Sequence, residues 1–449
     1  MRILQISTAD VSGGAERVAC NLLEGFRKRG HDSWLAVGYK RTKDHDIFEI
    51  PNLDSRNAWA RLCLSRDKQL KRMENRSKSK WVLRRVLAAI GDPARGVQHW
   101  LGREDFHHPG TIHIPDLPPR PPDILHAHNL HGAYFDLRQL PDLSGRFPML
   151  MTLHDAWLFS GHCAHSFDCD RWQKGCGECP DLSIYPAVER DATARNWRVK
   201  QEIYSKSKVY VATPSRWLKE RLDRSTLNAA VIESRVIPNG IDLGTFRPGD
   251  RQAARAALGL PPDAAVLLFA AAGTTQNIWK DYKTLREAVE RVAAKRSLRQ
   301  VVFLALGQEG PTEHVGTAQI RHIAYQQDPR DVSRYYAASD VYLHASRADT
   351  FPNVTLEAMA CGVPVIATAI GGIPEQIEDA RTGFLVPPGN AEVMAQRIEQ
   401  TLTDKALRQR MSGTAASTVR DRFDLNRQVT EYLDWYQEIV ARHGKQNHN

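Results

Sequence analysis

Two acidic residues, Asp349 and Glu357, flank the expected start of a short helix, with seven residues between them. We expect this helix to begin near Pro352–Asn353 and to end by Gly362, because proline favours a first turn and glycine a helix end. The free N–H groups at a helix N-terminus favour a phosphate, and flanking carboxylates can hold hydroxyl groups. The pattern suits a nucleotide sugar. Taken alone, it also fits an acidic loop that complements the helix dipole, plus one solvated glutamate.

The stretch from His344 to Gly372 resembles the donor-binding segment of glycosyltransferase family 4 enzymes, which have the GT-B fold. Their signature is E-x7-E followed by A-M-A-C/S-G-x-P-V and then a G-G-x-x-E turn. This chain reads Asp349-x7-Glu357, then AMACGVPV from residue 358, then GGIPE from residue 371. It departs from the family in having Asp at the first acid and T-F-P where the family has G-F-G.

The resemblance implies an α/β protein of the GT-B class, with two Rossmann-like doubly wound domains that face each other across a cleft. The second domain would bind a nucleotide diphosphate sugar with UDP or GDP as its nucleotide, and the first a glycan or lipid-linked acceptor. The sugar would move with retention of configuration, in the assembly of a polysaccharide or cell-envelope glycan. The leaving phosphate would act as the base, so the reaction would need no divalent metal or other cofactor.

The resemblance also assigns roles to residues of this chain. Glu357 would hold the ribose hydroxyls, and Asp349 and His154 would orient the sugar. Lys280 and the helix start would stabilise the leaving diphosphate. The remaining binding residues that it implies are the Gly13–Gly14 loop, the helix start at Asn353, Val354 and Thr355, and the base-contacting pair Tyr325 and Gln326.

The elements that must position these residues can be read from the hydrophobic pattern. The second half alternates strands and helices, which predicts a parallel doubly wound sheet with strands at 265–271, 301–306, 320–325, 341–344 and 363–367. Lys280 falls between the first of these strands and a helix from residue 282. In the N-terminal half, strands at 3–7 and 33–39 enclose the Gly13–Gly14 loop and a helix. A glycine pair at such a place lets backbone N–H groups approach a phosphate, although glycine pairs at turns are common.

Strands at 123–128 and 148–155 end in polar residues. The carboxyl edge of a parallel sheet is where open α/β folds bind ligands, so His128, His131 and His154 are candidates. For an isolated histidine, a satisfied structural role is the more common one. His154 lies in a T-L-H-D-x-W segment that resembles the His-bearing strand end of the family.

The domain boundaries are expected as follows. Residues 1–239 form the acceptor domain, including a basic insertion at about 41–122 and a Cys-rich loop at 160–181. Residues 240–424 form the donor domain, after a V-I-P-N-G-I-D crossover that resembles the family's. Residues 425–449 form a helix that crosses back, with Tyr432, Trp435 and Tyr436 packed on the first domain. Residues 115–122 read as a proline-rich linker.

The basic insertion contains an amphipathic helix whose apolar face carries Trp81, Val82, Leu83, Val86, Leu87 and Ile90. Two interpretations stay open. The helix can pack on its own domain through that face, or it can rest on anionic lipid and present a lipid-linked acceptor.

Four of the seven cysteines, Cys163, Cys169, Cys176 and Cys179, fall within 17 residues. In a cytoplasmic enzyme this spacing favours metal over disulfides, and the C-x-x-C pair suits tetrahedral zinc. A structural zinc ion beside the cleft and reduced or reversibly oxidised thiols both remain open. A zinc deaminase is excluded, because the required His-x-Glu is absent.

Length and composition limit the number of domains, the location of the protein and the kinds of partner that it can have. The length of 449 residues favours two domains, and the N-terminus lacks the apolar core of a signal peptide. We therefore expect a cytoplasmic protein, or one at the inner face of the cytoplasmic membrane if the basic helix meets lipid. The net charge of +9 permits anionic partners, but no nucleic-acid module is present. A catalytically silent GT-B module that binds nucleotide or scaffolds an assembly is the alternative function.

Overall fold

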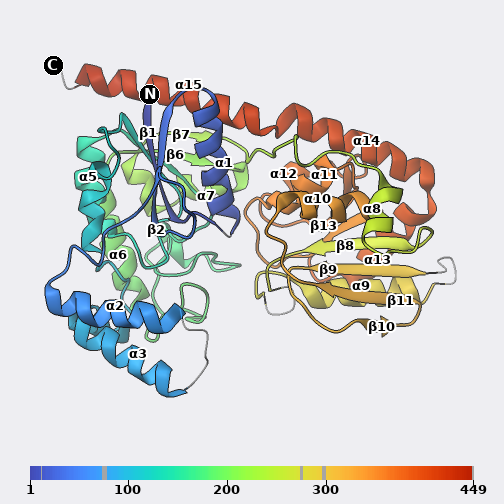
Figure 1. Cartoon of the computed structure of the whole chain (residues 1–449), viewed down its shortest axis with the longest axis horizontal. Helices are drawn as coiled ribbons and strands as arrows, with labels where there is room; N and C mark the ends of the chain where they lie inside the picture. The colour runs from blue at the N-terminus through green and yellow to red at the C-terminus, as the bar shows by residue number, and fades with distance from the viewer. Residues whose placement is uncertain (12, 73–77, 274–276, 296–299, 447–449) are drawn as a thin grey trace. The chain divides into compact units, whose positions relative to one another are not determined.

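The computed structural model describes the chain except residues 12, 73–77, 274–276, 296–299 and 447–449. Its described residues form two α/β units (Figure 1). Unit 1 comprises Met1–Thr213, Leu218–Val236 and Tyr432–Asn449, and unit 2 comprises Pro214–Trp217 and Ile237–Glu431. The division thus follows Val236 rather than residue 239, and the segment Pro214–Trp217 belongs to unit 2, which the sequence did not indicate.

Unit 1 is built on a seven-stranded parallel sheet in the order β3-β2-β1-β4-β5-β6-β7. Its strands are β1 Arg2–Ala9, β2 Asp32–Tyr39, β3 Ile47–Glu49, β4 Ile124–Ala127, β5 Met149–Thr152, β6 Val209–Thr213 and β7 Val231–Val236. Its helices are α1 Gly14–Lys28, α2 Ala58–Arg72, α3 Lys78–Gly91, α4 Pro93–Trp100, α5 Leu140–Arg146, α6 Thr193–Tyr204 and α7 Arg216–Asp223, the last of which starts in unit 2. The 3₁₀ helices are η1 Pro109–Asp116, η2 Leu137–Gln139, η3 Arg171–Gln173 and η4 Thr226–Ala230. The central strands are buried on both faces, which is the burial expected of a parallel sheet covered by helices.

Unit 2 has a second seven-stranded sheet in the order β10-β11-β9-β8-β12-β13-β14. Its strands are β8 Ala265–Ala270, β9 Val301–Leu306, β10 Glu313–Val315, β11 Ala318–Ile323, β12 Val341–His344, β13 Val365–Thr368 and β14 Gly383–Val386. Its helices are α8 Arg251–Ala257, α9 Tyr282–Ala293, α10 Pro329–Ala338, α11 Asn353–Ala360, α12 Ile373–Gln376, α13 Ala391–Thr403, α14 Lys405–Arg422 and the start of α15 Leu425–Gln446. All pairs are parallel except β10 with β11, a short edge hairpin that the sequence reading missed.

The last helix, α15, starts at Leu425 and changes from unit 2 to unit 1 at Tyr432. Tyr432, Trp435 and Tyr436 are completely buried. In unit 1 the Tyr432 hydroxyl bonds Thr152 at 2.7 Å and the Tyr436 hydroxyl bonds His126 at 2.5 Å. The predicted packing of these aromatic residues on the first domain is therefore confirmed.

Some local boundary predictions were wrong. The strand expected at 148–155 is β5 Met149–Thr152, which ends three residues earlier. The strand expected at 320–325 is β11 Ala318–Ile323, which ends two residues earlier. The expected linker at 115–122 is preceded by η1, which extends into it as far as Asp116. No helix among the described residues combines the length and the apolar character needed to cross a bilayer.

Candidate active site

Lys280 lies in the loop between β8 and α9, and backbone contacts fix this loop to the loop after β12. The N–H of Arg347 donates to the Trp279 carbonyl at 2.9 Å, and Lys280 forms a β-bridge with Ser346. Both loops follow the carboxyl ends of adjacent parallel strands, the edge at which open α/β sheets bind ligands.

The Lys280 side chain meets three polar groups there. Its Nζ forms an ion pair with Asp349 Oδ2, and it lies 3.2 Å from Ser346 Oγ and 3.4 Å from His344 Nε2. His344 Nε2 lies 3.1 Å from the same Asp349 oxygen. We call these four residues the Lys280 cluster. Sequence reasoning identified Lys280 and Asp349 but missed Ser346 and His344, whose signal was a histidine ending an otherwise apolar strand.

The protonation states in the Lys280 cluster follow from burial and charge. Burial and the neighbouring Lys280 ammonium lower the pKa of His344 to about 4, so its imidazole is neutral near pH 7 and Nε2–H donates to Asp349. Burial opposes ionisation of Asp349, but Lys280 and His344 outweigh it and hold the pKa of this carboxyl well below its usual range. The cluster therefore contains one ammonium and one carboxylate, both largely withdrawn from water.

The start of α11 is held by its own side chains. Gln376 Nε2 donates to the Pro352 carbonyl at 3.0 Å, and Thr355 Oγ1 donates to Gln376 Oε1 at 2.6 Å. Asn239 Nδ2 donates to Asn353 Oδ1 at 2.9 Å. The N-cap residue is Pro352, whose side chain makes no capping hydrogen bond, and the helix begins at Asn353 as the sequence predicts. Since these side chains are engaged in fixing the helix start, a phosphate bound here would meet backbone N–H groups.

Glu357 is not a solvated surface residue. It is 4% exposed, and the Tyr336 hydroxyl donates to its Oε2 at 3.1 Å. Burial raises the pKa of Tyr342 well above its ordinary value, and the charges of both Glu357 and Asp349 raise it further. The burial of Glu357 and its hydrogen bond from Tyr336 exclude the interpretation as a solvated surface residue.

The glycine pair after β13 packs against the loop that carries Asp349. Gly371 has a φ of +55°, and a Cβ there would lie 1.8 Å from the Asp349 carbonyl oxygen. The N–H of Gly372 donates to the Thr350 carbonyl at 3.1 Å. Residue 371 must therefore be glycine for the Asp349 loop to keep its position.

The predicted base-contacting pair follows the end of β11. Tyr325 is 48% exposed, and Gln326 Nε2 donates to the Ala324 carbonyl at 2.9 Å. Among the described residues, no hydrogen bond connects this pair to the Lys280 cluster.

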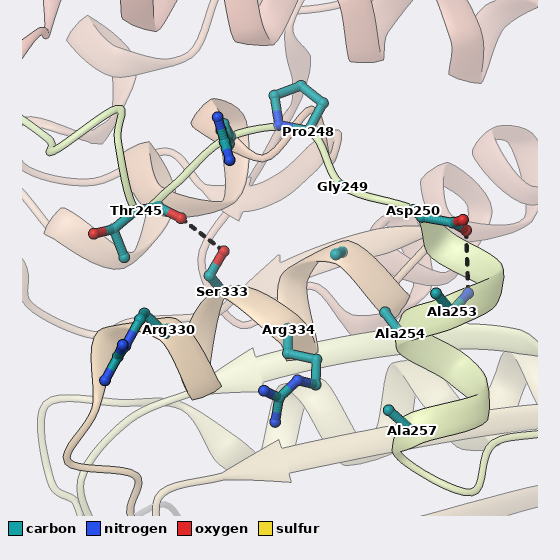
Figure 2. A pocket seen from close by; sticks show the side chains of 12 residues that line it. Thr245, Pro248, Gly249, Asp250, Ala253, Ala254, Ala257, Arg330, Ser333 and Arg334 are labelled. Atoms are coloured by element: carbon teal, nitrogen blue, oxygen red, sulfur yellow. Dashed lines mark hydrogen bonds between the residues drawn. The ribbon is translucent and has the colours of Figure 1, made fainter.

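A cavity of about 620 Å³ lies elsewhere in unit 2, between α8 and α10 (Figure 2). Its floor is made of alanines such as Ala253 and Ala257, and Arg330 and Arg334 line it from α10. Their guanidinium groups pair with Asp328 and Asp331 of their own segment, and the lining includes no residue of the Lys280 cluster. This cavity is separate from the candidate site.

In unit 1, His154 takes part in a chain of hydrogen bonds that assigns its tautomer. Gln5 Nε2 donates to the Ala19 carbonyl, so Gln5 Oε1 accepts from His128 Nε2 at 3.0 Å. Burial lowers the pKa of His128 well below its ordinary value, so its ring is neutral and Nδ1 accepts from His154 Nε2 at 3.0 Å. Burial lowers the pKa of His154 to about 4, which leaves its Nδ1 as a hydrogen-bond acceptor. We call Gln5, His128 and His154 the histidine relay.

His131, the third histidine candidate, has a different role. Its Nε2 lies 2.6 Å from Asp155 Oδ2. Burial opposes protonation, but Asp155 outweighs it and raises the pKa of His131. This is a largely buried ion pair rather than part of the histidine relay.

The Gly13–Gly14 loop leads into α1, with Gly13 at its N-cap and at a φ of 99°. The Glu16 side chain folds back over this loop, since a Cβ on Gly13 would lie 2.1 Å from Glu16 Oε2. Burial raises the pKa of Glu16. The helix start that the sequence predicts as a phosphate contact therefore has a carboxyl of the same chain beside it.

The cysteines of the Cys-rich loop form no disulfide bonds. All seven cysteines are free, and burial raises the pKa of Cys163 to about 12 and that of Cys176 to about 11. His162 Nε2 lies 3.4 Å from Cys179 Sγ. In the described part of the chain, no three His, Cys, Asp or Glu side chains form a group that could hold a metal ion. A structural zinc ion at the four cysteines stays a prediction.

Comparison with known proteins covers both units. Residues 250–418 match the family described as glycosyl transferases group 1, and residues 96–245 match Glycosyltransferase Family 4. A D-inositol 3-phosphate glycosyltransferase of Saccharomonospora viridis is 34% identical over 227 residues, which are 48% of this chain and 52% of that protein. The chain thus spans about half the length of this curated relative. WcaC of Escherichia coli, named as a glycosyl transferase of colanic acid biosynthesis, is 24% identical over 71% of this chain and 77% of its own.

Solved structures share the fold along nearly the whole chain. Sucrose-phosphate synthase of Thermosynechococcus elongatus aligns with a TM-score of 0.62 at 17% identity, over 98% of this chain and 100% of that one. Anabaena HepE, solved with UDP-glucose, aligns with a TM-score of 0.58 at 18% identity, over 97% and 99%. The predicted GT-B class of two Rossmann-like domains is confirmed. With both of its units matched by the two family descriptions, the chain belongs to glycosyltransferase family 4.

Proposed function

We propose that this protein transfers a sugar from a nucleotide diphosphate sugar to a hydroxyl group of a glycan or lipid-linked acceptor, with retention of configuration. The observation that carries the proposal is the Lys280 cluster at the carboxyl edge of the second sheet, next to the start of α11 and the buried Glu357. An ammonium group, a helix N-terminus and two carboxylates are the groups that a pyrophosphate with an attached sugar and ribose requires.

In this proposal Lys280 and the α11 amides stabilise the charge that develops on the leaving diphosphate, which is the largest electrostatic demand of the reaction. Glu357, held by the Tyr336 hydroxyl, accepts hydrogen bonds from the ribose. Asp349, fixed by its bonds to Lys280 and His344, accepts from a sugar hydroxyl. The leaving phosphate takes the acceptor proton, so the proposal needs neither a separate protein base nor a divalent metal.

His154 offers a second contact to the transferred sugar. The histidine relay keeps its ring neutral and makes Nδ1 the acceptor nitrogen of the ring, and a neutral imidazole suits a sugar hydroxyl better than a phosphate oxygen. We therefore propose that it orients the sugar and does not bind the diphosphate.

The names of similar proteins suggest where to look for substrates. Matched proteins are named for D-inositol 3-phosphate glycosylation and for colanic acid biosynthesis, and HepE was solved with UDP-glucose. We propose UDP or GDP as the donor nucleotide and a polysaccharide or cell-envelope glycan as the product.

A panel of UDP- and GDP-sugars, scored first by thermal shift and then by nucleotide release, tests this function. We expect one nucleotide series to raise the melting temperature and to be turned over, slowly by hydrolysis without acceptor and faster with a glycan acceptor. Stabilisation without turnover for any donor or acceptor would favour a catalytically silent binding module. No stabilisation by any nucleotide sugar would contradict the proposal. Zinc analysis of the same preparation tests the predicted structural metal at the cysteines.

A further inference from the structure

The exposed apolar side chains of this protein are concentrated in the insertion that forms α2, α3 and α4. Of fifteen large hydrophobic residues that are exposed in the described chain, eight fall between residues 59 and 100. They are Trp59, Leu62, Val82, Leu83, Val86, Ile90, Val97 and Trp100. Scattered exposed hydrophobic residues are normal, but a concentration of them in one insertion is typical of a binding surface. We call these eight residues the apolar patch.

The orientation of α3 decides between the two interpretations of its amphipathic pattern. Val82, Leu83, Val86 and Ile90 share one face of the helix at i, i+1, i+4 and i+8, and they are 43–51% exposed. A helix that packs on its own domain through its apolar face would bury these residues. The interpretation of a packed face is therefore wrong for these four residues; the side chains of Trp81 and Arg85 lie outside the described part of the structure.

The neighbouring helices extend the same surface. Trp59 Nε1 on α2 donates to the Ile90 carbonyl of α3 at 3.3 Å, so the patches of the two helices adjoin. The Arg190 guanidinium stacks 3.7 Å above the Trp100 ring of α4. Trp59 and Trp100 are 59% and 53% exposed, and exposed tryptophan beside basic residues is typical of the interface between a bilayer and water.

The charge of the insertion supplies the second observation. Residues 58–100 contain eleven Lys and Arg against three Asp and Glu, a net charge of +8 within a chain whose total is +9. Two of the three acids already form ion pairs within the chain. Asp67 pairs with Arg84 at 2.8 Å, and the buried Asp92 pairs with Arg56. Arg61 and Arg66 are exposed on α2 beside Leu62. A basic surface with apolar side chains complements anionic lipid headgroups and the acyl region just below them.

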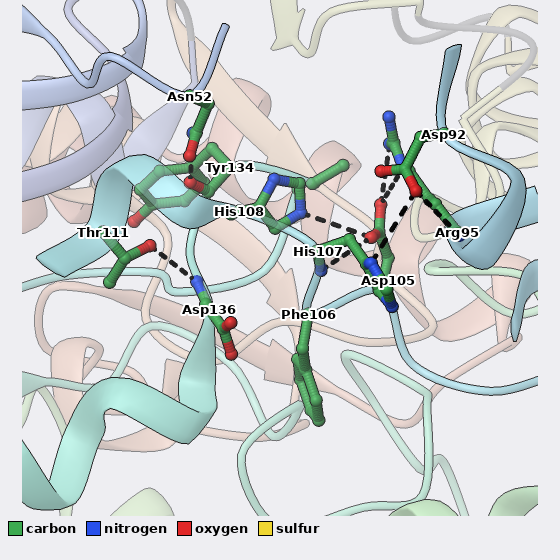
Figure 3. A network of polar contacts seen from close by, with 12 residues as sticks. Asn52, Asp92, Arg95, Asp105, Phe106, His107, His108, Thr111, Tyr134 and Asp136 are labelled. Carbon is green, nitrogen blue, oxygen red and sulfur yellow. Dashed lines mark hydrogen bonds and ion pairs between the residues drawn. The ribbon is translucent and has the colours of Figure 1, made fainter. Parts of the chain in front are cut away.

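A polar network fixes these helices to the body of unit 1 (Figure 3). Asp92 caps α4 by accepting from the Arg95 N–H at 3.0 Å, and Arg95 pairs with Asp105 at 2.7 Å. Burial opposes ionisation of Asp105, but His108 and Arg95 outweigh it and hold its pKa well below its usual range. Asn52 donates to the Tyr134 carbonyl at 2.7 Å. This network holds the helices that carry the apolar patch in a fixed position. Helix α3 also packs against both α2 and α4.

We propose that α2, α3 and α4 form a membrane-docking surface that binds bilayers containing anionic lipid. The side chains of the apolar patch enter the headgroup region, and the surrounding Lys and Arg pair with lipid phosphates. This proposal does not depend on sugar transfer, although it would bring unit 1 to a surface where a lipid-linked acceptor is held.

Vesicle flotation of the full-length protein tests the proposal. We expect it to float with vesicles of phosphatidylcholine mixed with phosphatidylglycerol, to remain below vesicles of phosphatidylcholine alone, and to be released by high salt. The double variant Val82→Glu/Val86→Glu should bind anionic vesicles at least about tenfold more weakly, because two carboxylates would have to enter the headgroup region. The charge variant Arg61→Glu/Arg66→Glu should weaken binding in a salt-dependent manner.

A matched control is Ile232→Glu, since Ile232 on β7 is 51% exposed, as Val82 is, but lies outside the insertion. It should float like the wild type. The proposal is overturned if the wild type does not float with anionic vesicles, or if the Val82 and Val86 variant floats as well as Ile232→Glu. A lipid-independent dimer in sedimentation, dissolved by the same valine variant, would assign the apolar patch to a second copy of the chain instead. Because flotation needs no nucleotide sugar, its failure leaves the proposed transferase activity to be judged separately.

Discussion

At the scale of single residues, neighbours fix the protonation and direction of the side chains that we assign to the sugar. Gln5 sets the ring of His128, and His128 sets the ring of His154, although Gln5 and His128 are 123 positions apart in the chain. No local pattern in the sequence could indicate this relay, because each partner is an ordinary polar residue inside a strand or at its end. The relay exists only once β1, β4 and β5 are paired side by side.

The relay predicts an effect of Gln5→Leu. Without the Gln5 acceptor, His128 is free to exchange tautomers, and the bond from His154 Nε2 is no longer enforced. We expect turnover to fall roughly tenfold, the loss of one positioned hydrogen bond worth about 1.4 kcal/mol. Nitrogen NMR shifts of His154 should show a mixed tautomer. The exposed Gln252→Leu serves as control, and an unchanged His154 spectrum in Gln5→Leu would disprove the relay.

His344 predicts a pH dependence of stability. Its folded pKa of about 4 lies below the ordinary 6.5, so between these values the unfolded chain binds more protons and folding stability falls as pH falls. Across this pH range the free energy of unfolding falls by about 3 kcal/mol in total. Above pH 6.5 the ring is neutral in both the folded and the unfolded chain, so His344 then causes no pH dependence. Denaturant unfolding of wild type and His344→Asn across this range checks it. The variant should show a shallower slope, and parallel curves would contradict the assignment of a neutral buried imidazole.

At the scale of elements, the positions of α11 and β12 could be predicted because the residues that start and end these elements locally agree with the tertiary structure. Proline before the helix, glycine after it and an apolar run on each side place the boundaries. The prediction failed at β11, where Tyr325 extended an apparent strand that ends at Ile323. It left the face of α3 open for a different reason: amphipathic spacing shows that the two faces of a helix differ, but not which face packs against the protein. Only the structure shows that the apolar face points outward.

The Asp349 loop depends on a close approach between two elements, which Gly371→Ala should disrupt. The new Cβ would meet the Asp349 carbonyl oxygen at 1.8 Å in a backbone conformation that favours glycine. We expect a loss of about 2–4 kcal/mol in the free energy of unfolding and weaker donor binding. Gly413→Ala is the control, because the space around Gly413 in α14 is open and alanine there should stabilise by about 0.5–1 kcal/mol. Equal stability of the two variants would contradict the packing argument.

At the scale of the whole molecule, the sequence predicted an α/β chain of two doubly wound units, because strands and helices alternate through most of it. The motifs from His344 to Gly372 then led to the family. The overall composition could not show how unevenly the charge is distributed along the chain. Nearly all of the net positive charge belongs to α2–α4 in unit 1, whereas the Lys280 cluster in unit 2 is close to neutral overall.

The central claim is that Lys280 and Glu357 hold and activate a nucleotide sugar, and turnover by Lys280→Gln and Glu357→Gln tests it most directly. Both substitutions keep a hydrogen-bonding side chain beside the present partner, Asp349 or Tyr336, so the fold should survive and thermal unfolding verifies it. Lys283→Gln, 86% exposed and three residues further on, is the control. We predict that each site variant loses roughly 100-fold or more in turnover of the donor that wild type uses, while Lys283→Gln keeps full activity. Near-normal turnover by both folded site variants would contradict the claim.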